Sequence, residues 1–272
     1  MPALARAGPH WLGTLLYVPL LYGIGWLTAR PLGWIAPGLR PDQLDLAGLV
    51  VALLLLLLTL PRRVAQVWGE AQPWRALGLR RPPRSGLAAL LGGLIMALLL
   101  LSLVTAVLIA SGQAIWAWRL GWAAVLNGLA LTTGVGFAEE LLFRGWLWGE
   151  LSLQGKAQSA LLLQAALFAL LHPWYRLEGF GAIGLLGGLI LLGIALALQR
   201  RSDGGALWGA IGLHGGLVGG WFVLQTGLVE ISSTAPAWLS GPGGANPNPI
   251  GGVIGWLGLG GFLLWQRKHW RA

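Results

Sequence analysis

Five ionisable residues lie within apolar stretches of this chain, where burying a charge is unfavourable. Glu139, Glu140 and Arg144 occur in the segment GFAEELLFR, His172 follows the segment FALL, and His214 lies in the segment GLHGG. Ionisable residues inside membrane-spanning helices are rare and by default indicate a functional site. Carboxylates and imidazoles together suit general acid–base catalysis, metal binding or a proton relay.

The spacing of these residues assigns them different tasks. Glu140 and Arg144 are four residues apart, so on a helix they share a face and are expected to form an ion pair. Glu139 lies about 100° further round the helix and cannot share that face. We therefore expect Glu139 to be the free carboxylate of the site and the Glu140–Arg144 pair to point away from it.

Long apolar runs indicate the elements that hold these residues. The chain has 272 residues, of which 56% are hydrophobic and 10% are charged, against about 25% charged in an average soluble domain. Runs of about 18 or more apolar residues predict membrane-spanning helices. The expected fold is an all-α, polytopic membrane protein with about eight transmembrane helices. The expected spans are 11–28, 44–60, 86–110, 122–150, 157–175, 180–198, 204–228 and 249–265.

Counting residues along the expected helices places the ionisable residues at similar depth. Glu139 lies about 14 residues before the turn near 153–156 and His172 about 16 after it, which is roughly 21–24 Å at 1.5 Å per residue. His214 lies about 11 residues, or roughly 17 Å, beyond the turn near 203. These counts predict one catalytic cavity among helices four to seven. The glycines around His214 predict close packing of its helix against its neighbours.

The distribution of basic residues predicts the orientation. Most lysines and arginines lie on one side of the expected membrane, notably in the Arg/Pro-rich loop 61–85, which places both termini in the cytoplasm. The net charge of +9 is then explained by cytoplasmic loops, and nucleic acid is not an expected partner. A multi-pass protein of the cell membrane is expected, and the absence of cysteine excludes disulfides and thiolate sites.

Three segments together resemble the motifs of a known family. Glu139-Glu140-x-x-x-Arg144, Phe168-x-x-x-His172 and the later His214 resemble the three motifs of the CPBP intramembrane proteases, which include the CAAX prenyl endopeptidases and bacteriocin-processing proteins. The resemblance divides the chain into 1–121, with N-terminal helices and a basic loop, a catalytic core at 122–228, and 229–272, with an outer loop and the last helix.

The resemblance implies an activity and roles for residues. It implies that the chain hydrolyses a peptide bond of a membrane-associated protein or peptide within the lipid bilayer. Glu139, His172 and His214 would be catalytic, and Glu140, Arg144 and Phe168 would support them. The third motif of the family ends in Asn or Asp four residues after its histidine, whereas this chain has Val218 there.

Two mechanisms fit the same residues. In the first, His172, His214 and Glu139 hold Zn²⁺ with an open position for water. In the second, Glu139 is the general base for a water held by His172, and His214 stabilises the oxyanion without a tightly bound metal. We favour the second, because pairing of Glu140 with Arg144 leaves the zinc site one carboxylate short.

Two other classes of function remain open. One is a non-catalytic scaffold that binds a membrane segment, and Val218 in place of Asn is the feature that favours it. Intramembrane Glu and His also occur in proton-coupled transporters, but no repeat relates residues 1–121 to 122–272, as the halves of many transporters would show. Pro173 predicts a kink in the helix that carries His172.

Overall fold

The computed structural model describes residues 8–244 and 246–270. The chain divides into two compact units, one ending at Ala76 and the other beginning at Leu77. Each unit is described by itself below.

The first unit is a helical hairpin. Its helices are α1 (Trp11–Ala29), α2 (Leu32–Ile35), α3 (Pro41–Arg63), the π-helical η1 (Val64–Trp68) and α4 (Pro73–Ala76). Helices α1 and α3 pack closely at glycines, since a Cβ on Gly25 would lie 2.3 Å from the carbonyl oxygen of Gly48. Tyr17 and Thr59 join the two helices by a hydroxyl–hydroxyl hydrogen bond of 2.8 Å.

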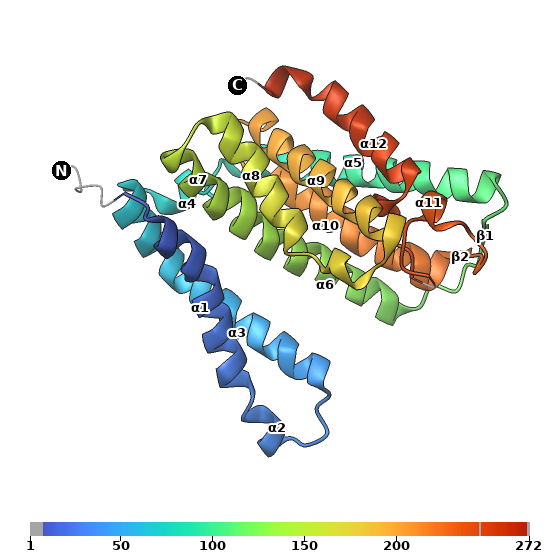
Figure 1. The fold of residues 1–272 in the computed structure, drawn as a ribbon, viewed down its shortest axis with the longest axis horizontal. Helices are drawn as coiled ribbons and strands as arrows, with labels where there is room; N and C mark the ends of the chain where they lie inside the picture. The colour runs from blue at the N-terminus through green and yellow to red at the C-terminus, as the bar shows by residue number, and fades with distance from the viewer. Residues whose placement is uncertain (1–7, 245, 271–272) are drawn as a thin grey trace. The chain divides into compact units, whose positions relative to one another are not determined.

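The second unit contains all five ionisable residues singled out above, and it is a bundle of helices (Figure 1). Its elements are α5 (Pro83–Ala110), β1 (Ala114–Trp116), α6 (Trp122–Glu140), η2 (Leu141–Leu147), α7 (Trp148–Gln154), α8 (Ala157–Leu170), η3 (Pro173–Arg176), α9 (Gly179–Ser202), α10 (Trp208–Val223), η4 (Leu224–Leu228), β2 (Val229–Ile231), α11 (Ala237–Ser240), η5 (Pro249–Gly251), α12 (Val253–Trp265) and η6 (Arg267–His269). The expectation of an almost wholly helical protein is confirmed. The exception is a two-stranded antiparallel ribbon in which Ala114 pairs with Ile231.

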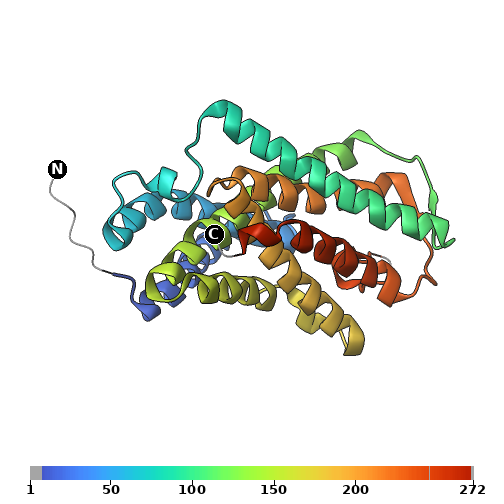
Figure 2. The same ribbon diagram turned by 90° about the horizontal axis from the view of Figure 1, so that it is seen from above.

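Helix α10 packs against α5, α6 and α9 (Figures 1 and 2). Its glycines allow this packing. A Cβ on Gly212 would lie 2.3 Å from the carbonyl oxygen of Leu90 on α5, and one on Gly215 would lie 2.0 Å from that of Thr132 on α6. Contacts this short exclude any side chain. The predicted role of the glycines around His214 is confirmed.

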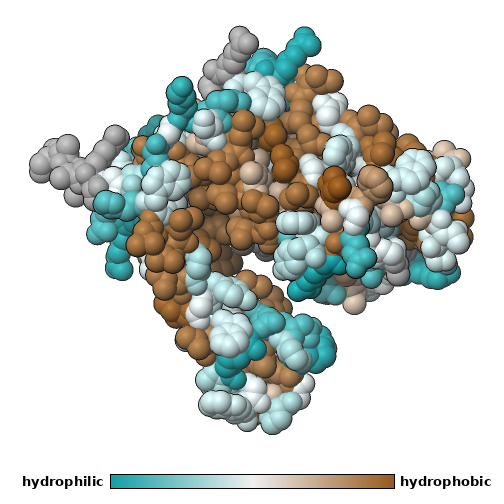
Figure 3. All heavy atoms as spheres, viewed as in Figure 1, coloured by the Kyte–Doolittle hydropathy of each residue, from teal (hydrophilic) through white to brown (hydrophobic). Residues whose placement is uncertain are grey.

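Four helical stretches are long and apolar enough to cross a membrane among the residues described: Trp11–Ile35, Pro41–Trp68, Pro83–Ala110 and Gly179–Ser202. Large apolar side chains on their outer faces are exposed, for example Leu58 and Leu98, and apolar residues occupy much of the surface in Figure 3. These findings indicate an integral membrane protein. Every other expected span contains a helix, but these helices are shorter or less apolar, so the number eight stays a prediction.

Candidate active site

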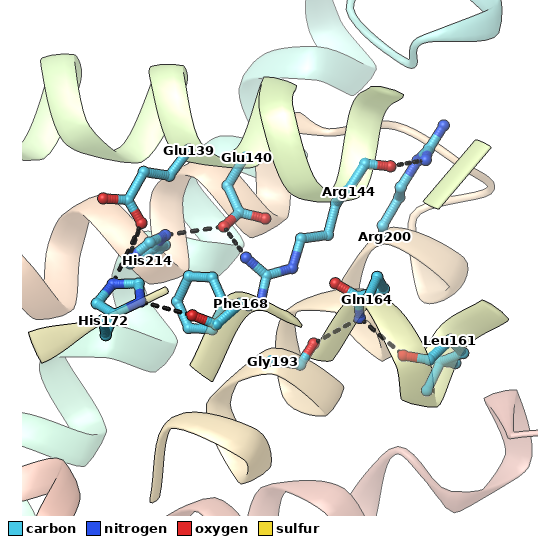
Figure 4. A network of polar contacts seen from close by, with 10 residues as sticks. All are labelled: Glu139, Glu140, Arg144, Leu161, Gln164, Phe168, His172, Gly193, Arg200 and His214. Atoms are coloured by element: carbon cyan, nitrogen blue, oxygen red, sulfur yellow. Dashed lines mark hydrogen bonds and ion pairs between the residues drawn. The ribbon is translucent and has the colours of Figure 1, made fainter. Parts of the chain in front are cut away.

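Glu139, His172 and His214 come together from three separate elements. Glu139 lies in the last turn of α6, His172 follows α8, and His214 lies in α10. Nε2 of His172 is 3.6 Å from Oε2 of Glu139, and Nε2 of His214 is 3.9 Å from the same oxygen. In Figure 4 the three side chains point toward one another. The structure therefore brings together the three residues that the sequence selected.

Each histidine is held at its other ring nitrogen. Nδ1 of His172 lies 2.7 Å from the carbonyl oxygen of Phe168, and Nδ1 of His214 lies 2.8 Å from Oε1 of Glu140. A carbonyl oxygen and a carboxylate only accept, so both Nδ1 atoms are assigned as the donors. In the neutral imidazoles, both Nε2 atoms then present a lone pair toward Glu139.

Glu140 is part of this site. The predicted ion pair with Arg144 is confirmed, with Nη1 donating to Oε1 over 2.9 Å. The expectation that the pair points away is wrong, because the same Oε1 also accepts the bond from His214. The imidazole lies where both carboxylates reach it, with Nδ1 on Glu140 and Nε2 facing Glu139. An angle of about 100° between adjacent helical residues therefore does not prevent both carboxylates from contacting one imidazole.

Phe168 supports three of the polar groups at once. Its ring lies 4.2 Å from the Arg144 guanidinium carbon, 4.4 Å from the His172 ring and 5.7 Å from the His214 ring. A cation over an aromatic face is attracted by the ring quadrupole. Arg144 has no acceptor for Nε or Nη2 among the described residues, so this ring is its main further contact. Phe168 is fully buried and fixes the positions of both histidines.

The backbone at His172 differs from the predicted kinked helix. Helix α8 ends at Leu170, and His172 is extended (φ −86°, ψ 154°) before the 3₁₀ turn that Pro173 begins. The proline ring disfavours the helical region for the residue that precedes it. The carbonyl of Ala169, which a kink would leave free, accepts a hydrogen bond of 3.2 Å from the His172 amide. Proline thus ends the helix and turns His172 toward the site.

The expected zinc site stays a prediction. Within 8–244 and 246–270, no group of three or more His, Asp or Glu side chains is placed to hold a metal ion. No step below depends on a metal bound by His172, His214 and Glu139.

Buried polar residues that the sequence analysis did not single out lie beside the cluster. Gln164 on α8 donates to the carbonyls of Leu161 and Gly193 over 3.0 and 3.2 Å. Arg200, in the last turn of α9, donates from Nη1 to the backbone carbonyl of Arg144 (Figure 4). The sequence does show Gln164 as a polar residue within an apolar helix. It gives no sign of the contact of Arg200, because that contact joins residues 56 positions apart.

Comparison with protein families agrees with the geometry. Residues 121–220 match the family model described as Type II CAAX prenyl endopeptidase Rce1-like. Residues 2–72 match a domain of unknown function (DUF8676). Searches of curated proteins and of solved structures found no match. The matched range 121–220 contains all six residues that the sequence analysis assigned to the site.

Proposed function

From the premise that residues 121–220 belong to the CPBP protease family through their Rce1-like match, we propose that this chain is an intramembrane endopeptidase. It hydrolyses a peptide bond of a membrane-associated protein or peptide with a water molecule activated by Glu139. One observation carries this proposal. Two imidazole Nε2 atoms and one carboxylate oxygen face one another at 3.6 and 3.9 Å, and that oxygen has no hydrogen-bond partner among the described residues.

Oε2 of Glu139 and Nε2 of His172 face each other at 3.6 Å, and two such acceptors favour a molecule that donates protons between them. A water has two protons to donate and a lone pair to direct at a carbonyl carbon. The side chains of Glu139 and His172 are 30% and 25% exposed, whereas Oε2 of Glu139 is itself buried, so the proposed water enters by a small movement of these side chains. A general base has to lie within hydrogen-bond reach of the proton it removes, directly or through one water. This supports Glu139 as the base and His172 as the residue that orients the water.

The proposed reaction has two steps. The water oxygen attacks the carbonyl carbon, and its proton moves to Oε2 of Glu139. His214, in its protonated form, donates from Nε2 to the oxyanion, while Glu140 accepts from its Nδ1 and balances its charge. The C–N bond then breaks, and the proton on Glu139 passes to the leaving amine. Arg144 and Phe168 hold Glu140 and the two histidines in place.

Cleavage of a panel of membrane-associated peptides in vesicles tests the proposal. We expect wild type to release products, Glu139→Gln to release none above background, and Glu178→Gln to match wild type. Glu178 is a suitable control because it is an exposed glutamate before α9 whose side chain makes no capping hydrogen bond. Equal background with wild type and Glu139→Gln on every peptide would contradict the proposal.

Val218 favours the scaffold as the second candidate. It replaces the Asn or Asp of the family motif, and an apolar side chain supplies no oxyanion donor. Retained binding of a membrane peptide without cleavage by wild type would support this alternative. Metal analysis of the same preparation, with and without a chelator, tests the zinc hypothesis separately. Stoichiometric zinc whose removal abolishes cleavage would overturn the mechanism with Glu139 alone.

A further inference from the structure

Arg200, in the last turn of α9, binds both chain segments that bring Glu140 and His214 together. Its Nη1 donates to the backbone carbonyl of Arg144 in η2 (Figure 4), and its Nε donates to the carbonyl of Gly205 over 3.2 Å. Glu140 immediately precedes η2, and Gly205 lies in the turn that leads into α10, the helix of His214. One guanidinium therefore holds the approaches to both partners of the Glu140–His214 hydrogen bond.

The carbonyl of Arg144 is available to a side chain because η2 is π-helical. In an α-helix this carbonyl would accept from the amide of Trp148, four residues later. That amide donates instead to the carbonyl of Phe143, five residues back. π-helical turns are rare and occur frequently at functional sites. Nη1 of Arg200 stabilises this turn, and loss of that donor lets the α-helical register return, which shifts Arg144 relative to Glu140.

The turn before α10 is held from a second side. Gly204 and Gly205 have φ of +61° and +84°, a conformation that favours glycine. Arg81 donates to the carbonyl of Gly204 over 2.6 Å. A Cβ on Gly78 would lie 2.4 Å from the carbonyl oxygen of Gly205, so the backbone before α5 packs directly on this turn. The turn is therefore a fixed point to which Arg200 ties η2.

The neighbouring Arg201 shows what is particular to Arg200. Both guanidinium carbons lie over the ring of Trp148, at 5.4 Å for Arg200 and 5.3 Å for Arg201. Nη1 of Arg201 donates to the carbonyls of His269 and Trp270 over 3.2 and 2.8 Å. The two arginines share an aromatic contact and bonds to backbone carbonyls, but among the described residues only Arg200 donates to η2.

We propose that Arg200 is a positioning residue for the reaction at Glu139. By tying η2 to the turn before α10, it sets the hydrogen bond between Glu140 and His214. That bond in turn directs Nε2 of His214 toward Glu139. This inference rests on the proposed peptidase function and adds a residue outside the polar cluster that determines the geometry of the cluster.

Exchange of the His214 ring proton with solvent tests the positioning independently of catalysis. The chain has four histidines, so NMR with ¹⁵N-labelled histidine gives few ring resonances, and His214→Asn assigns the one of interest. In wild type, Nδ1 of His214 is bonded to Glu140 and the side chain is 3% exposed, so exchange is slow. Arg200→Gln should accelerate it at least about tenfold, the equivalent of one lost hydrogen bond. Arg201→Gln should leave it unchanged.

The indole proton of Trp221 reports on general opening of the bundle. Trp221 lies seven residues after His214 on α10, and its Nε1 donates to the carbonyl of Pro247 over 2.8 Å. Exchange at Trp221 should be the same in wild type and Arg200→Gln. Arg200→Lys keeps the charge and one donor, so its effect at His214 should be smaller. If Arg200→Gln does not fold, Arg200→Lys against Arg201→Lys makes the same comparison, with faster exchange at His214 expected only in the first.

Kinetics test the effect on the reaction. Arg200→Gln should lower kcat about 10- to 100-fold, since a misplacement of about 1 Å caused far from the chemistry costs up to about 10²-fold. KM should stay the same, because Arg200 acts on the polar cluster and not on the substrate. Arg201→Gln should change neither constant.

The outcomes separate this inference from the function on which it rests. Faster exchange at His214 in Arg200→Gln, without cleavage of any peptide by wild type, overturns the peptidase and leaves the positioning. Cleavage by wild type, with unchanged exchange and kcat in Arg200→Gln, overturns the positioning and leaves the peptidase. Equal acceleration at His214 and Trp221 also overturns the positioning, because it shows a general loss of stability.

Discussion

The polar cluster has a buried half and an open half. Glu140 and Arg144 are 0% exposed and His214 is 3% exposed, and hydrogen bonds of 2.8 and 2.9 Å join them. Glu139 and His172 are 30% and 25% exposed, and the contact between them is 3.6 Å long. The first half is closed to solvent and joined by hydrogen bonds, whereas the second is partly exposed and its contact is longer. Two adjacent glutamates therefore have different tasks because of what surrounds each of them.

The largest effect on rate is expected in the open half. Glu139→Gln removes the proposed base but breaks no hydrogen bond of Oε2, because this oxygen makes none to the described residues. Cleavage should fall about 10²- to 10⁴-fold, the range of general acid–base catalysis, while the melting temperature in detergent stays the same. A large loss of stability would show that Glu139 stabilises the fold as the buried half does.

The largest effect on stability is expected in the buried half. Glu140→Gln leaves the Arg144 guanidinium buried without a counter-charge, and breaking a buried pair in this way destabilises a protein by about 3–5 kcal/mol. Chemical denaturation of the purified variant measures this loss. A variant of normal stability that is inactive would move Glu140 from support to catalysis and remove the distinction between the two halves.

A gain in rate is expected at Val218. Val218 lies one turn after His214 on α10, so an amide there would lie on the helical face that carries His214. Val218→Asn should raise the rate by up to about 10²-fold, the lower end of the value of one oxyanion donor. Val218→Thr, with nearly the same shape, is the control for polarity alone. No gain with Asn would show that another group already stabilises the oxyanion.

The smallest effect is expected for an ion pair at the surface. Arg119 and Glu230 are 3.1 Å apart, with side chains 74% and 53% exposed. Arg119→Gln should change the free energy of unfolding by less than about 1 kcal/mol, against the several kcal/mol expected for Glu140→Gln. The same denaturation measurement compares the two. Equal losses of free energy of unfolding would mean that burial does not explain the stabilising effect of the Glu140–Arg144 pair.

The sequence alone predicted the class of fold and the members of the site. Apolar runs are long enough that helices follow from composition, and charged residues inside such runs are conspicuous because burying them is unfavourable. Spacing of four residues predicted the Glu140–Arg144 pair, because that contact lies within one helix. Glycines predicted the close packing of α10 for the same local reason.

Only the tertiary structure decided which way these residues face. The bond between Glu140 and His214 joins positions 74 apart, and no periodicity within one helix reports the angle between two helices. The contact of Arg200 with the Arg144 carbonyl likewise depends on packing between distant segments. Local patterns identify which residues carry chemistry, and the crossing of helices determines which of them meet.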